Sequence, residues 1–261
     1  MNDVYEYVEG DLPLLISVPH DGRELPQDIA ARMTTAGRAT PDTDWDVAKL
    51  YEFAAAMGAT VLVANFSRYV VDLNRAADGS VLYPGQLVTG LCPQETFAGD
   101  GIYRQGNVGE DETAARVAKY WRPYHDRIRA TLDAMRVEHG FALLWDAHSI
   151  PSVVPRLFDG ELPLLNLGSN NGASCGHNIE NAVWRIAAAS SCSAVCNGRF
   201  TGGFITRHYG DPENRFQALQ LEIAQRAYMD EEAVSFDEEK AQNLRNVLKT
   251  MLHAFLDAAV Q

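Results

Sequence analysis

The chain has little of what marks a membrane or secreted protein. No apolar run reaches the ~20 residues that cross a bilayer, and the acidic first eleven residues lack the apolar core of a signal peptide. The four cysteines form no C-x-x-C pair, and four in 261 residues do not make a disulfide scaffold. We therefore expect reduced thiols, a cytoplasmic location and no membrane partner.

Basic residues are also scarce. The sequence has 22 lysines and arginines against 35 aspartates and glutamates, a formal net charge of −13. Nucleic acid is excluded as a partner, because binding a polyanion usually requires a basic surface. A small anionic substrate remains compatible, provided that arginines in its pocket offset the negative field of the whole protein. The composition does not define the oligomeric state.

What is present indicates a folded α/β enzyme. Hydrophobic residues make up 46% of the chain, and no repeat or linker divides it, so residues 1–261 are expected to form one domain. Apolar strands alternate with amphipathic helices, which predicts a sheet covered on both faces. Strands are expected at 13–19, 59–64, 69–72, 141–145, 162–167, 193–196 and 216–223, and helices at 42–57, 110–139, 177–190 and 238–260.

Polar residues follow several of the predicted strands, where ligand sites of open α/β sheets lie. His20 ends the first strand, and Asp146 and His148 follow the strand at 141–145. Aspartates at 42, 44 and 46 open the next helix. Two histidines, one carboxylate and a water form a known catalytic zinc shell. No H-E-x-x-H or similar ligand pair is present, so helix-capping or structural roles remain open for each residue.

Arginines and one glutamate complete the candidate set. Arg75, in the segment DLNR, has the planar fork that holds a carboxylate at two points, and Arg68 is placed to stabilise an oxyanion. Arg207, after two glycines, offers a second anion anchor. Glu222 stands in an otherwise apolar strand, where a carboxylate is costly unless it is paired or catalytic. Surface ion pairs and an ordinary glycine loop are the alternatives.

Several segments together resemble the N-formylglutamate amidohydrolase family. The resemblance covers residues 13–232 and rests on SVPHDG, TDWDVAKLY, ANFSRYVVDLNR, ETFAGDGIYRQG, WRPYHDRI, LLWDAHSI, GGFITRHYG and LQLEIAQRAYMDE. Their number and order make the resemblance specific. The family is similar to the wider zinc carboxypeptidase and aspartoacylase group, and the DLNR segment is shared with the aspartoacylase-like enzymes.

The resemblance implies a three-layer α/β/α sandwich with a mixed central sheet. It also implies hydrolysis of N-formyl-L-glutamate to formate and L-glutamate, a step of histidine catabolism, with one zinc or another divalent transition metal per chain. By the same resemblance, His20, Asp44 and His148 match the metal ligands, Glu222 the general base and Arg68 the arginine that polarises the carbonyl.

The remaining matches concern the substrate. Asn74 and Arg75 match the site of the α-carboxylate, and Arg207 matches, more loosely, the side-chain carboxylate. The wider group takes two metal ligands from H-x-x-E, but an arginine, Arg23, stands three residues after His20. The TDW segment favours Asp44 as the carboxylate ligand, and the alternatives are Asp42, Asp46 and Glu24.

Two other functions remain open at this level. One is a related metal-dependent hydrolase of another N-acyl amino acid or of a peptide, and the other is a metal-free binding protein for acidic metabolites. The glycine- and proline-rich stretch at 79–109 is expected to contribute residues that face the acyl group, with Tyr103 and Arg104 as candidates for a lid.

Overall fold

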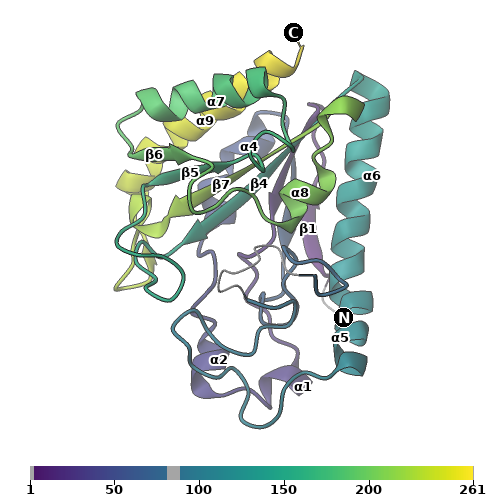
Figure 1. Cartoon of the computed structure of the whole chain (residues 1–261), viewed down its shortest axis with the longest axis vertical. Coiled ribbons are helices and arrows are strands. Elements are labelled where there is room, and N and C mark those ends of the chain that lie inside the picture. Colours follow the sequence, from purple (N-terminus) through teal and green to yellow (C-terminus); the bar gives the residue numbers. More distant parts are fainter. Residues whose placement is uncertain (1–2, 81–88, 261) are drawn as a thin grey trace.

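The computed structural model describes residues 3–80 and 89–260 (Figure 1). A seven-stranded sheet has the order β1-β3-β2-β4-β7-β5-β6. The strands are β1 (Tyr5–Val8), β2 (Leu14–Val18), β3 (Thr60–Ala64), β4 (Ala142–Ile150), β5 (Leu165–Gly168), β6 (Ala194–Cys196) and β7 (Phe216–Ala224), and a separate two-stranded sheet contains β8 (Met229–Asp230) and β9 (Ser235–Phe236).

The sheet is mixed, as expected. Strands β3, β2, β4 and β7 run parallel, whereas β1 and β5 are antiparallel to the neighbours β3 and β7. Parallel strands bring their carboxyl ends to one edge, and the chain leaving β2 at this edge leads to the short helices α1 (Gln27–Ala30) and α2 (Thr35–Ala39). Figure 1 shows these helices and long loops gathered below the sheet.

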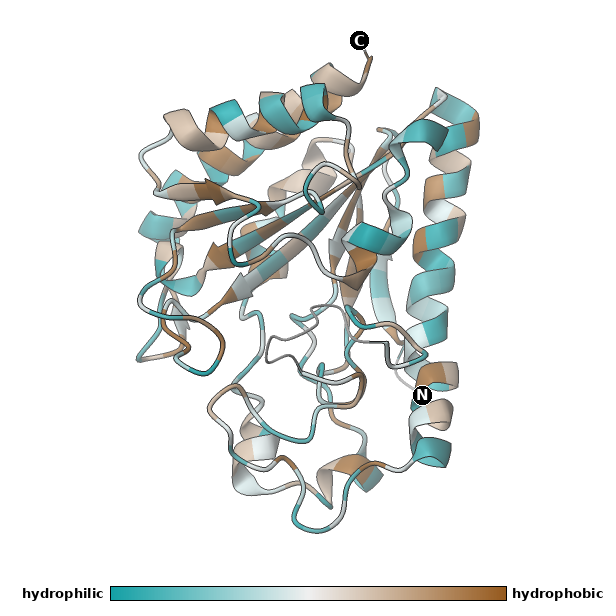
Figure 2. Cartoon of the chain, viewed as in Figure 1, coloured by the Kyte–Doolittle hydropathy of each residue, from teal (hydrophilic) through white to brown (hydrophobic). Residues whose placement is uncertain are grey.

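Side chains of the central strands alternate between two cores. In β2, Leu14, Ile16 and Val18 pack in one cluster and Leu15 packs in the other. Each fully buried side chain of this kind stabilises the fold by about 1.5–3 kcal/mol. Figure 2 shows hydrophobic and hydrophilic residues interleaved along the helices that flank the sheet. This arrangement confirms the predicted three-layer α/β/α sandwich.

The helices divide between the two faces. Helices α7 (His177–Ala189) and α9 (Glu238–Val260) pack on one face, and α6 (Arg122–His139) packs on the other, as Figure 1 shows. The other helices are α3 (Val47–Leu50), α4 (Phe53–Ala56), α5 (Glu110–Arg116), α8 (Phe204–Tyr209), a π-helix η1 (Val117–Trp121) and the 3-10 turns η2 (Pro212–Asn214) and η3 (Gln225–Ala227). Across residues 3–80 and 89–260, none of the helices combines the length and the apolar character needed to cross a bilayer.

Two element predictions are wrong for physical reasons. The helix predicted at 42–57 begins only at Val47 and is interrupted after Leu50, because the segment before it is drawn inward by a hydrogen bond from Asp44 N to His20 O at 3.1 Å. The strand predicted at 69–72 is a turn. Its carbonyls at Tyr69 and Val70 accept hydrogen bonds from the guanidinium of Arg116, in the place of N–H donors from a neighbouring strand.

The helix predicted at 110–139 changes character before Pro123. Proline has no N–H to bond the carbonyl four residues earlier, and the turn before it widens into the π-helix η1. This brings two side chains onto the backbone of the DLNR segment. Trp121 Nε1 donates to Arg75 O at 2.9 Å, and His125 Nε2 donates to Leu73 O at 2.9 Å. The two rings stack at 3.7 Å between centroids.

The buried imidazole of His125 should make folding sensitive to acid. Desolvation lowers the pKa of His125 to about 3, against ~6.5 in an unfolded chain. Between these values the unfolded state binds more protons, so the contribution of His125 is complete above pH 6.5 and is lost as pH falls toward 3.

We predict that the unfolding free energy of His125→Asn falls less steeply than that of the wild type from pH 6.5 to pH 5. The difference in slope should approach about 1.4 kcal/mol per pH unit. Urea unfolding at several pH values measures it, with His253→Asn, at an exposed position of α9, as the control. Parallel curves for wild type and His125→Asn would contradict the assignment.

Candidate active site

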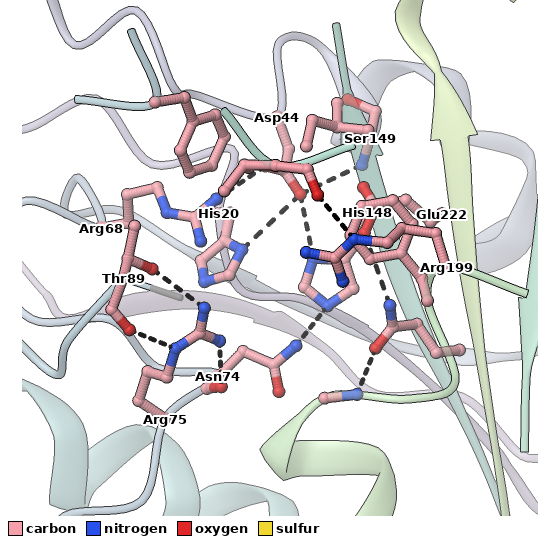
Figure 3. A pocket seen from close by; sticks show the side chains of 16 residues that line it. His20, Asp44, Arg68, Asn74, Arg75, Thr89, His148, Ser149, Arg199 and Glu222 are labelled. Atoms are coloured by element: carbon pink, nitrogen blue, oxygen red, sulfur yellow. Dashed lines mark hydrogen bonds and ion pairs between the residues drawn. The ribbon is translucent and has the colours of Figure 1, made fainter. Parts of the chain in front are cut away.

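The predicted metal ligands come from three separate segments that meet at the carboxyl edge of the sheet. His20 follows β2 by two residues, Asp44 lies in the loop before α3, and His148 belongs to β4. All three residues are at most 2% exposed. One ligand atom from each lies within 4.8 Å of the others, and Figure 3 shows the three side chains converging.

The distances suit a metal ion. Nδ1 of His148 lies 3.0 Å from Asp44 Oδ2, and Nδ1 of His20 lies 3.7 Å from the same oxygen. Ligand atoms of a tetrahedral zinc site, with bonds of ~2.1 Å, lie roughly 3.4 Å apart. Both imidazoles therefore present the same nitrogen to one carboxylate oxygen at a spacing that a small divalent cation would fill.

A second carboxylate orients each histidine. His20 Nε2 is 2.8 Å from Asp72 Oδ1, and His148 Nε2 is 3.1 Å from Asp146 Oδ2. Both aspartates are fully buried. Metal-binding histidines usually bond a carboxylate through the other ring nitrogen, which fixes the tautomer and leaves the metal-facing nitrogen with its lone pair. Sequence analysis selected Asp146 and His148 together after one strand, whereas it gave Asp72 no role.

Opposite charges within this group shift the pKa values in opposite directions. Burial alone would raise the pKa of Asp44, but His20 and His148 lower it below its usual value. Burial would likewise lower the pKa of His148, but Asp146 and Asp44 raise it well above the ordinary range. A divalent cation bound here would replace the proton on His148, since an imidazole must be neutral to bind a metal.

Two of the three alternative carboxylates, those of Asp42 and Asp46, are engaged elsewhere. Asp42 accepts hydrogen bonds from the Tyr69 hydroxyl at 2.6 Å and from Phe97 N at 2.8 Å. Asp46 pairs with Arg23 at 2.6 Å, and the backbone of Glu24 forms a bridge to Phe66. Among the described residues, Asp44 is the carboxylate that the structure groups with His20 and His148.

Glu222 lies beside this group, in register with His148 across the β4–β7 pair. Its side chain lines the same pocket and is almost completely buried. Burial raises the pKa of Glu222 to about 8, against the opposing attraction of His148. A carboxyl group whose pKa lies near neutrality can both accept and return a proton, as a general base and acid must.

Arg68 also faces the pocket and is tied to two of the aspartates. Its guanidinium lies 2.8 Å from Asp72 Oδ2 and 3.4 Å from Asp44 Oδ1. Burial opposes the charge, but these carboxylates raise the pKa of Arg68 above its usual value, so the group stays cationic. Within the described residues, its buried Nε has no hydrogen-bond partner. A fixed cation of this kind suits the stabilisation of an oxyanion.

The DLNR segment delivers Asn74 and Arg75 to the pocket. The Asn74 side chain is largely committed, with Nδ2 2.9 Å from His148 Nε2 and Oδ1 accepting from Ile205 N at 2.8 Å. Gly203 is needed here, because a Cβ at that position would lie 2.2 Å from Asn74 Nδ2. Arg75 is oriented by the carbonyl and the hydroxyl of Thr89, at 2.8 and 2.9 Å.

The structure leaves one predicted arginine out of the pocket lining and adds another that was not predicted. Arg207 donates to Gly202 O and to Thr201 Oγ1, each at 2.8 Å, and is not among the residues that line the pocket. Arg199, which sequence analysis did not select, does line it. The short NGRF segment after β6 carries no signal beyond an Asn-Gly turn.

The stretch at 79–109 contributes residues to the pocket, as expected. The two lid candidates, Tyr103 and Arg104, are not among the residues that line it. Thr89 and Phe97 line the pocket. The Tyr103 hydroxyl accepts from Arg116 instead, at 2.8 Å, and Arg104 N bonds the carbonyl of Arg32. The part of the stretch at 81–88 lies outside the described residues.

A buried His–Asp–His group beside a glutamate and arginines, at the carboxyl edge of a mixed sheet, defines an enzyme of the hydrolase class. The sequence matches the model of the N-formylglutamate amidohydrolase family over residues 12–229, and the chain belongs to that family. The resemblance found in the sequence motifs is thereby confirmed.

Curated relatives support this assignment, and two solved structures share the fold. The chain is 46% identical to the N-formylglutamate deformylases of Pseudomonas putida and Pseudomonas aeruginosa, over 98% of its own length and 97% of theirs. Its fold is similar to that of an N-formylglutamate amidohydrolase from Ralstonia eutropha, with a TM-score of 0.82, 24% identity and 96% of both chains covered. A protein from Agrobacterium tumefaciens is also similar in fold, with a TM-score of 0.73, 19% identity, and 97% and 96% covered.

Proposed function

We propose that the chain hydrolyses N-formyl-L-glutamate to formate and L-glutamate with one zinc ion per chain. The observation that carries the chemistry is the buried His20–Asp44–His148 group with Glu222 beside it. The substrate follows from the two deformylases that share 46% of their residues with this chain. Two imidazoles and one carboxylate favour zinc among the common divalent metals. A cytoplasmic location and a place in histidine catabolism stay predictions.

His20, Asp44 and His148 would hold the metal, and Asp72 and Asp146 would orient the two histidines. When bound, zinc would acidify a water molecule and polarise the formyl carbonyl. The residues of the chain supply the other functions: a base for the attacking water, a cation for the carbonyl oxygen and a binding site for the rest of the substrate.

In the proposed reaction, Glu222 takes a proton from the water whose oxygen bonds the formyl carbon. Arg68 stabilises the negative charge that forms on the carbonyl oxygen. Glu222 then gives the proton to the amide nitrogen as the carbon–nitrogen bond breaks, which releases formate and the amine of glutamate. Arg75 holds the α-carboxylate, which keeps the formyl carbon in place.

Arg75→Ala should lower kcat/KM for N-formyl-L-glutamate at least tenfold, mainly through KM. The guanidinium is held by Thr89 and presented to the pocket, so its loss removes a charge-assisted contact that alanine cannot replace. Initial-rate kinetics measure the effect, with Arg38→Ala, in α2 and outside the pocket, as the control. A fall of less than twofold would remove Arg75 from the substrate site.

The proposed function is tested by the hydrolysis of four substrates, followed through the formate or acetate that each one releases. N-formyl-L-glutamate, N-acetyl-L-glutamate, N-acetyl-L-aspartate and a short N-formyl peptide are supplied to the zinc-loaded protein. Preferred turnover of N-formyl-L-glutamate supports the proposal. Turnover of another member of the panel in its place would keep the hydrolase and change the substrate.

A further inference from the structure

Arg199 is a pocket cation that neither the sequence motifs nor the proposed mechanism uses. It lies in the loop after β6, half-buried, and lines the same pocket as the His20–Asp44–His148 group. Figure 3 shows Arg75 and Arg199 approaching the two histidines from different sides. The two arginines are therefore placed to contact different ends of one bound molecule.

The contacts of Arg199 leave its charge without a carboxylate. Its Nε donates to Leu157 O at 2.8 Å, and its guanidinium lies 5.1 Å from the centre of the Phe200 ring. In residues 3–80 and 89–260, no aspartate or glutamate forms an ion pair with Arg199. By contrast, Arg68 in the same pocket pairs with two aspartates.

The pocket differs in charge from the chain as a whole. In the sequence, acidic residues outnumber basic ones 35 to 22. The described pocket lining reverses that balance, with three arginines against Asp44 and Glu222. An excess of positive charge in a cavity of an acidic protein indicates an anionic ligand.

The loop holds Arg199 in place through its neighbours. Asn197 has a left-handed backbone, with φ of 50°, and its side-chain oxygen accepts from Ser169 N at 2.9 Å. Phe200 packs against an apolar cluster around Ile150. The Nε bond to Leu157 O then directs the guanidinium, whose two terminal nitrogens can form a fork to a carboxylate.

We propose that Arg199 binds the side-chain carboxylate of the substrate and thereby selects glutamate derivatives over glutamine derivatives. This inference rests on the proposed function, in which Arg75 holds the α-carboxylate. It assigns to Arg199 the role that the family resemblance gave, more loosely, to Arg207. A dianionic substrate would then be held by one arginine at each carboxylate.

The test compares N-formyl-L-glutamate with N-formyl-L-glutamine, which has a neutral amide of nearly the same shape in place of the side-chain carboxylate. Arg199→Ala should lower kcat/KM for the glutamate compound at least tenfold and for the glutamine compound less than threefold. Arg199→Gln keeps a donor for Leu157 O and should give the same pattern. This variant replaces Arg199→Ala in the test if the alanine variant does not fold.

Two further variants make the result specific. Arg136→Ala removes another half-buried arginine whose Nε donates to a backbone carbonyl, Asn214 O at 3.0 Å, and should leave the ratio of the two substrates unchanged. Arg207→Ala tests the rival position. Loss of selectivity in Arg207→Ala with retention in Arg199→Ala, or an equal fall for both substrates in Arg199→Ala, would overturn the assignment.

Binding of the products separates this inference from the proposed function. Calorimetric titration with L-glutamate and L-glutamine needs no turnover. If the wild type releases no formate from N-formyl-L-glutamate, the proposed function fails by itself. The inference about Arg199 then stands if wild-type protein prefers L-glutamate and Arg199→Ala does not, and it fails if the preference is absent or survives the substitution.

Discussion

Glu222→Gln should lower kcat for N-formyl-L-glutamate at least a hundredfold while the metal content stays the same. Glutamine keeps the shape of the side chain but cannot take a proton from water, and general-base catalysis contributes about 10²–10⁴ to a rate. Glu222 is in register with His148 on the neighbouring strand but is not in the His20–Asp44–His148 group, so metal retention is expected. Steady-state kinetics and metal analysis of the same sample measure both quantities.

Glu180→Gln is the matched control for this substitution. Glu180 is 8% exposed, like Glu222, and its carboxylate bonds Ser169 and Asn197 outside the pocket. Replacement of a buried carboxyl group by an amide should therefore affect stability in both variants, and kcat only in Glu222→Gln. Near-normal turnover of Glu222→Gln would show that another group accepts the proton.

Asp44→Asn should lower the affinity for zinc by more than about a hundredfold and abolish formate release. The amide has no negative charge to place between the two histidines, and even groups that only orient metal ligands change affinity about 10–100-fold. The substitution also removes one of the ion pairs of Arg68. Competition with a chromophoric chelator measures the affinity.

Asp42→Asn decides between two carboxylates that the sequence left open. Asp42 is also buried and stands two residues away, but it bonds the Tyr69 hydroxyl and Phe97 N. The Asp42→Asn variant should retain zinc with an affinity close to that of the wild type. If Asp42→Asn lost the metal and Asp44→Asn kept it, the ligand set proposed here would be wrong.

The sandwich fold was predictable because its signals are local. Runs such as residues 14–18 are apolar except for one serine, and only a covered sheet buries such strands completely. The structure of residues 42–57, where one continuous helix was predicted, could not be read from the sequence. Its aspartates have the pattern of helix caps, yet Asp42 and Asp44 bond partners that lie 27 and 104 residues away in the chain. Tertiary contacts of this separation leave no trace in local propensity.

The same distinction applies to the site. His20 and His148 could be selected because each follows or ends a predicted strand, and the structure brings both to Asp44. Arg199 could not be selected from the sequence. Its role depends on which carboxylates lie near it and on where the loop after β6 returns to the sheet, and both are set by the fold. Asp72 was visible in the DLNR segment, but only the fold shows that it orients His20.

We propose that this chain is a metal-dependent deformylase of N-formyl-L-glutamate. The most direct measurement is formate release by one preparation as purified, after removal of metal by a chelator, and after stepwise return of zinc. We predict that chelation abolishes release and that zinc restores it in proportion, up to one ion per chain. Full formate release from the protein without metal would contradict the account.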